Sequence, residues 1–182
     1  MPPPNRSDVA VLGMGNILYR DEGVGVYAVH QLRAAYRFRP AIELVDGATL
    51  GFELPGYFHA GADLLVLDAL LADDRPGTVY RLPAEELLRL GSDTQPMAHE
   101  VDPVQQLKLA TALGEPLDLT LVGIVPADTS GLEVGLTPQL RAAFPAFIQA
   151  VLAELRQRGI HADRVQSVPL DEVIGGLVEG AR

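Results

Sequence analysis

The stretch VAVLGMGNILYRDEGVG, residues 9–25, decides the fold. It begins with four apolar residues, as a buried strand does, and breaks at two glycines before an acidic pair, Asp21 and Glu22, leads into a helical pattern. A dinucleotide-binding loop would need a third glycine where Leu18 stands, and acids at the helix start would repel a pyrophosphate. The loop therefore suits a cation or a positioned carboxylate. The alternative is an ordinary strand-to-helix turn whose acids favour the helix dipole.

Short apolar runs alternate with helical patterns along the rest of the chain. The runs 64–67 and 119–125 are almost uninterrupted, as in strands covered on both faces, whereas 79–82 alternates and indicates an edge strand. Thr137 followed by Pro138 is typical of a helix start. This alternation predicts one three-layer α/β/α sandwich with a mostly parallel sheet of about five strands. Strands are expected at 9–12, 42–45, 64–67, 79–82 and 119–125, and helices at 24–36, 104–113 and 138–158.

Length and composition bound the domain organisation and the partners. The 182 residues suffice for one domain, expected at 8–160, after a Pro-rich disordered segment at 1–7 and before a C-terminal tail at 161–182 that carries little signal. A net charge of −10 argues against nucleic acid or an anionic membrane as the partner. The absence of cysteine excludes disulfides, thiolate metal ligands and a cysteine nucleophile, and it fits a reducing cytoplasm.

Carboxylates follow several of the predicted strands. Asp46, Asp68 and Asp128 come at or just after the ends of three of them. Because ligands bind beyond the carboxyl ends of parallel strands, these acids are expected at the functional edge of the sheet. Asp68 ends an apolar run, where a carboxylate is costly to desolvate unless it is paired, liganded or used as a cap. Asp46 before Gly47 is equally typical of a turn, and Asp128 is interpreted as a solvated loop charge.

Among the four histidines, His99 offers the best candidate ligand. It precedes a predicted helix, where a structural role is the alternative, while His30 is expected on the surface of its own helix. Together with Glu22 and Asp68, His99 completes a set of two carboxylates and one imidazole. Such a set suits a divalent transition metal with open coordination positions. No HExxH motif and no GxSxG motif is present, which argues against a zincin site and a serine nucleophile.

Five ordered segments resemble the [NiFe]-hydrogenase maturation endopeptidases, with the similarity running over about residues 9–159. The chain departs from the family at Ala48, where a second glycine is usual. The matching residues are GMGNIL at 13–18 with DEGVG at 21–25, DGATLG at 46–51, LDA at 67–69, LVGIVP at 121–126 and GLTP at 135–138, with His99 in the family's order.

The resemblance implies a cytoplasmic endopeptidase that removes the C-terminal extension from the precursor of the hydrogenase large subunit after nickel insertion. It also implies that Glu22, Asp68 and His99 bind the nickel, which the substrate supplies. Water is then activated either by the metal or by a carboxylate, Asp46 or Asp21, and the family's grouping with aspartic peptidases favours the carboxylate. We expect the protein to be a monomer.

Two other functions compete with this interpretation. One is a metal-dependent hydrolase of small substrates that keeps its own metal. The other is a nickel-binding accessory or chaperone module that holds the immature subunit without cutting it. An assay for the shortened substrate separates the chaperone from the protease, and metal analysis of the purified protein separates the small-substrate hydrolase from both.

Overall fold

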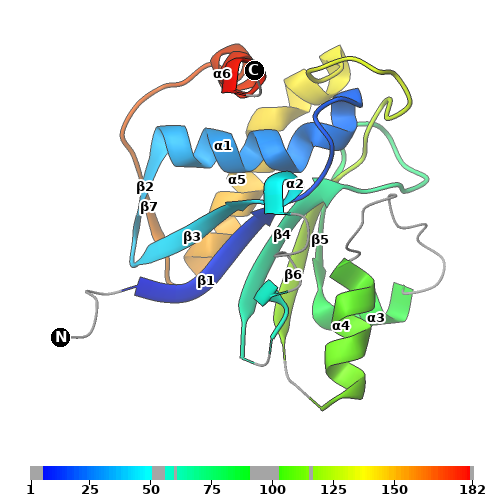
Figure 1. Cartoon of the computed structure of the whole chain (residues 1–182), viewed down its shortest axis with the longest axis vertical. Coiled ribbons are helices and arrows are strands. Elements are labelled where there is room, and N and C mark those ends of the chain that lie inside the picture. The colour runs from blue at the N-terminus through cyan, green and yellow to red at the C-terminus, as the bar shows by residue number, and fades with distance from the viewer. Residues whose placement is uncertain (1–5, 51–55, 60, 91–102, 115–116, 181–182) are drawn as a thin grey trace.

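A computed structural model describes residues 6–50, 56–59, 61–90, 103–114 and 117–180. Its centre is a five-stranded sheet with the order β3-β1-β4-β6-β5, in which only β5 runs antiparallel to its neighbour (Figure 1). The predicted mostly parallel sheet is therefore confirmed, as is the edge position of the alternating strand. The strands are β1 (Arg6–Gly13), β3 (Ala41–Asp46), β4 (Asp63–Ala69), β5 (Val79–Pro83) and β6 (Asp118–Ile124).

Helices cover both faces of the sheet. In β4, Leu65 and Leu67 pack under α1 and α5, whereas Leu64 and Val66 pack against α3 and α4. Burial on both faces explains why this strand is apolar without alternation. The helices in these layers are α1 (Val24–Ala35), α3 (Ala84–Leu90), α4 (Pro103–Ala112) and α5 (Pro138–Gln157).

The long helix α5 begins where the sequence predicts. The hydroxyl of Thr137 accepts a hydrogen bond from the backbone N–H of Leu140 at 3.4 Å, and Pro138 occupies the first helical position. A capping hydroxyl satisfies one of the free N–H groups of a first helical turn, and proline there has no N–H to satisfy. Pro145 lies inside the helix on its exposed side, and the helix continues to Gln157.

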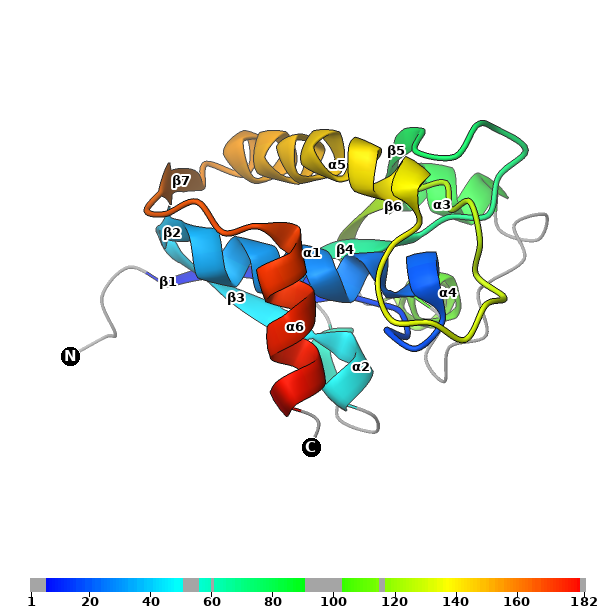
Figure 2. The ribbon, with the colours of Figure 1, turned by 90° about the horizontal axis from the view of Figure 1, so that it is seen from above.

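The C-terminal segment forms elements for which the sequence offers little signal. The strand β7 (His161–Arg164) pairs with β2 (Tyr36–Arg39) in a separate antiparallel ribbon. The helix α6 (Leu170–Gly180) then lies across α1, as Figure 2 shows. The short helix α2 (Gly47–Leu50) directly follows β3. The apolar side of α6 is buried, so this segment extends the α1 layer. No helix in the described part of the chain is long and apolar enough to cross a membrane.

Candidate active site

The candidate acids lie along the carboxyl edge of the sheet, as the strand order requires. Gly13, the last residue of β1, is paired with Asp46 of β3 on one side and with Leu67 of β4 on the other. Asp46 and Asp68 are therefore two strands apart, about 10 Å at ordinary strand spacing. The loop between β1 and α1 carries Glu22 over the same edge.

Strand alternation turns the two strand-terminal acids toward opposite faces of the sheet. Leu67 and Ala69 belong to the core under α1 and α5, so Asp68 between them faces the α3 and α4 layer. Val45 belongs to the core on the α3 and α4 side, and the carboxylate of the next residue, Asp46, contacts His30 on α1. A bound substrate that reaches both acids must pass across the edge of the sheet.

Asp68 is held in place at the end of its strand. Its side chain is buried, with a relative exposure of 7%, and its Oδ1 accepts the N–H of Ala69 at 2.8 Å. A buried carboxylate in this position needs partners that offset its desolvation.

Glu22 lies in the short 3₁₀ helix η1 (Arg20–Gly23), which two glycines bring close to the strand ends. Gly15 has a φ of +121°, and a Cβ there would stand 1.8 Å from the carbonyl oxygen of Glu22. At Gly25, a Cβ would stand 2.1 Å from the carbonyl oxygen of Leu67. Only glycine allows both approaches, so the GxG and DEGVG segments are required by the position of Glu22 above the sheet.

His99 lies outside the described residues. Among those that the structure describes, no three histidine or acidic side chains gather closely enough to hold a metal ion. The predicted set of Glu22, Asp68 and His99 therefore stays a prediction. Its two described members both lie at the carboxyl edge.

Asp46 and His30 form a pair that the sequence did not indicate. His30 Nε2 lies 2.8 Å from Asp46 Oδ2, and the N–H of Ala48 donates to Oδ1 of Asp46 at 3.0 Å. The side chains of His30 and Asp46 are only 24% and 11% exposed. The expectation that His30 is a surface residue is wrong, because β3 and α6 flank the side of α1 on which it lies.

A pocket of about 540 Å³ opens beside this pair, between α1, α2 and α6. His30 and Asp46 are among its lining residues, and most of the others are apolar. The remaining polar side chains are Thr49 and Glu172. The carboxylate of Asp46 is thus held by His30 and by the N–H of Ala48, and a molecule in the pocket can reach it. The other lining residues include Ile17, Val26, Val168, Val173 and Leu177.

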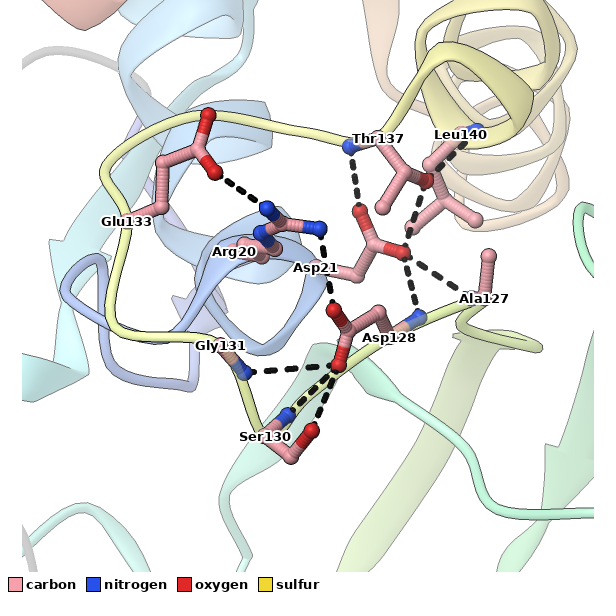
Figure 3. A network of polar contacts seen from close by, with 9 residues as sticks. All are labelled: Arg20, Asp21, Ala127, Asp128, Ser130, Gly131, Glu133, Thr137 and Leu140. Atoms are coloured by element: carbon pink, nitrogen blue, oxygen red, sulfur yellow. Dashed lines mark hydrogen bonds and ion pairs between the residues drawn. The ribbon is translucent and has the colours of Figure 1, made fainter.

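Asp21, the other candidate base, has a different environment (Figure 3). It is fully buried, and its Oδ1 accepts the N–H of Thr137 at 2.7 Å. Its Oδ2 accepts the Thr137 hydroxyl at 2.8 Å and the N–H groups of Ala127 and Asp128 at 2.9 and 3.0 Å. Four donors from one distant loop occupy both carboxylate oxygens, which is the pattern of a structural acid.

Arg20 extends this network outward. Its guanidinium donates to Asp128 at 2.9 Å and to Glu133, and these contacts raise the pKa of Arg20, the Glu133 hydrogen bond most of all. The pKa of Asp128 is lowered, first by the backbone N–H of Ser130 and then by the Ser130 hydroxyl. Asp128 is a partly exposed loop charge, as the sequence predicts, and its carboxylate also pairs with Arg20 and accepts hydrogen bonds from Ser130.

Comparison with known proteins identifies similar sequences over most of the chain. A family model described as hydrogenase maturation protease matches residues 26–154. The hydrogenase 2 maturation protease of Escherichia coli strain K12 is 35% identical over 156 residues, covering 85% of this chain and 94% of that protein. A hydrogenase expression/formation protein, HupD, of Rhizobium leguminosarum bv. viciae is 32% identical, covering 87% of this chain and 79% of the relative.

The fold is similar to that of a solved relative. The structure described as hydrogenase maturating endopeptidase HybD from E. coli superposes with a TM-score of 0.70 at 34% sequence identity. The match covers 86% of this chain and 97% of that one.

Proposed function

This chain belongs to the hydrogenase maturation protease family and is an endopeptidase, and on that premise we propose how it selects and cuts its substrate. The substrate is the precursor of a [NiFe]-hydrogenase large subunit, and the product is the subunit without its C-terminal extension. Cleavage follows nickel insertion and takes place in the cytoplasm, which fits a chain without cysteine.

Nickel is recognised as part of the substrate, by Glu22, Asp68 and His99. Two carboxylates and one imidazole leave coordination positions open for groups that the precursor supplies. The observation that carries this proposal is the placement of Glu22 and the buried Asp68 at one edge of the sheet. Glu22 lies at this edge because Gly15 and Gly25 let its loop pack closely against the strand ends. Asp68 lies there because it stands near the end of the apolar strand β4.

Asp46 is the better of the two candidate general bases. Both oxygens of Asp21 are occupied by donors from the chain itself, so Asp21 has no place for a water that must lose a proton. Asp46 keeps a side open to the pocket, while His30 and the Ala48 N–H fix its orientation. A base must lie within hydrogen-bond reach of the proton it removes, and an oriented carboxylate beside a pocket meets that condition.

The roles of the two strand-terminal acids follow from the face each one occupies. Asp68 holds the metal on the α3 and α4 side of the edge, and Asp46 acts on water from the α1 side. The substrate chain crosses the edge between them. If the metal activated the water instead, the water would attack the peptide bond on the face of the sheet that Asp68 occupies.

The test compares nickel-loaded precursor, nickel-free precursor and a bare peptide that spans the cut site. We expect the wild-type enzyme to shorten only the nickel-loaded precursor, as a size shift on a gel shows. Glu22→Ala abolishes this processing with an unchanged circular dichroism spectrum. The matched control is Asp118→Asn, an exposed acid at the opposite end of β6, which processes normally. Equal cleavage of all three substrates would remove nickel from the recognition step.

A further inference from the structure

Two loops at the carboxyl edge are joined along their backbones. One follows β1 and carries Leu18 and Tyr19, and the other follows β6 and carries Leu132 to Val134. The N–H of Glu133 donates to the carbonyl of Leu18 at 2.9 Å, and the N–H of Arg20 donates to the carbonyl of Glu133 at 2.9 Å. Since β4 separates β1 from β6 in the sheet, these loops meet only beyond the strand ends.

The joined loops expose apolar side chains, which we call the apolar platform: Leu18, Tyr19, Leu132 and Val134. Their relative exposures are 49%, 38%, 76% and 37%. Within the described residues, eight large apolar side chains are exposed, and these four together with Leu71 after β4 lie at the carboxyl edge. Single exposed apolar residues are ordinary, but a group of them marks an interaction surface.

Hydrogen bonds and ion pairs, some of them buried, hold together the two loops that carry the platform. Asp21 ties its loop to the backbone of residues 127, 128 and 137, and Arg20 pairs with Asp128 and Glu133 (Figure 3). The buried hydroxyl of Tyr27 donates to the carbonyl of Ile17 at 3.2 Å and accepts the N–H of Gly135 at 3.0 Å, which bridges the same two loops. A surface ordered before binding loses little conformational entropy when a partner docks.

The position of the platform identifies its occupant. Tyr19 stands three residues before Glu22, and the two residues between them belong to the same fixed loop. A precursor whose metal is bound by Glu22 therefore comes close to the loop that carries Leu18 and Tyr19. We propose that the apolar platform is the docking surface for the large-subunit precursor, and that it binds apolar side chains near the scissile bond. This inference rests on the proposed substrate and on the role proposed for Glu22, and the KM comparison below tests the docking surface separately from nickel recognition.

The test measures kcat and KM for precursor processing by Leu132→Ser and by the double variant Leu18→Ser/Leu132→Ser. Truncating an apolar contact at the centre of an interface weakens binding by about tenfold or more. We expect the KM of Leu132→Ser to rise about tenfold and that of the double variant to rise further, with kcat unchanged. Val134→Thr keeps the side-chain shape, so it changes the KM in the same direction without a risk to folding.

Leu113→Ser is the matched control, because Leu113 is 64% exposed and follows α4 toward the amino end of β6. Its KM should equal that of the wild type. A KM for the double variant no higher than that of Leu113→Ser would overturn the docking surface while leaving the protease function intact. Cleavage of nickel-free precursor would contradict nickel recognition, but the KM comparison between variants would still decide the platform.

Discussion

Asp21 and Asp46 stand at the same edge of one sheet, yet their surroundings separate a structural acid from a candidate catalytic one. Asp21 is fully buried and accepts four hydrogen bonds from residues 127–137. Asp46 accepts one hydrogen bond from a neighbouring N–H, contacts one histidine and borders a pocket. The comparison teaches that an acid in a family motif has to be judged by the number of its acceptor positions that the protein already uses.

The largest effect is expected at Asp46. Asp46→Asn keeps the size of the side chain but removes the base, and general-base catalysis contributes about 10²- to 10⁴-fold to the rate. We expect kcat for nickel-loaded precursor to fall by that factor, with little change in KM. A single-turnover assay followed by gel shift measures it, and a normal rate would move water activation to the metal.

His30 supplies the control for this change. His30→Gln keeps an N–H that can reach Asp46 and should retain most of the activity. His30→Leu removes this contact, so the carboxylate is held only by the N–H of Ala48 and the activity should fall. Misplacing a catalytic group costs about 10- to 100-fold. Equal activity of the two His30 variants would show that the contact with Asp46 does not matter to the reaction.

The next effect concerns stability at Asp21. Asp21→Ala leaves the buried N–H of Thr137 and the part-buried N–H groups of Ala127 and Asp128 without their acceptor. A buried donor without an acceptor costs about 1 to 3 kcal/mol, and a part-buried one costs less. We expect the free energy of unfolding to fall by about 3 to 5 kcal/mol in urea denaturation. Asp46→Ala, measured beside it, should lose about 1 kcal/mol at most. Equal stability of the two variants would contradict the assignment of Asp21 as a structural acid.

The smallest effect is a pH dependence at Asp128. The Ser130 N–H and hydroxyl and the Arg20 guanidinium hold the pKa of Asp128 below its unfolded value, so the ionised form favours the folded state. This contribution is complete above the unfolded pKa of about 3.9 and is lost as the pH falls through the folded pKa. Asp128→Asn should therefore lose less stability than the wild type on acidification below about pH 4. Parallel thermal melts of the two proteins across that range test the difference, and curves of identical slope would contradict it.

Much of the fold follows from local patterns. The nearly continuous apolar runs of β4 and β6 indicate burial on both faces, the alternation in β5 indicates an edge strand, and Thr137 with Pro138 marks the start of α5. Each of these signals is contained within a few neighbouring residues. For that reason, no knowledge of the rest of the chain is needed to read them.

The contacts that define the site join residues far apart in the sequence, so no local pattern predicts them. The pairing of β2 with β7 joins residues more than 120 positions apart, and α6 is recognisable only when α1 is there to bury its apolar side. His30 meets Asp46 because of the crossing of α1 over β3, which no pattern in either element specifies. The strand ends predict that Asp46 and Asp68 share an edge, but the register is needed to show that they face opposite sides of the sheet.

The hydrogen bonds of Asp21 also set an order of events during synthesis. They reach residues 106 to 116 positions further along the chain. The loop that carries Glu22 therefore cannot take its final shape on the ribosome until Thr137 has emerged and α5 has begun to pack. Such distant contacts slow folding, because a long segment of chain must be closed before they can form. A nascent protease that still lacks its last quarter has no assembled site with which to cut a precursor.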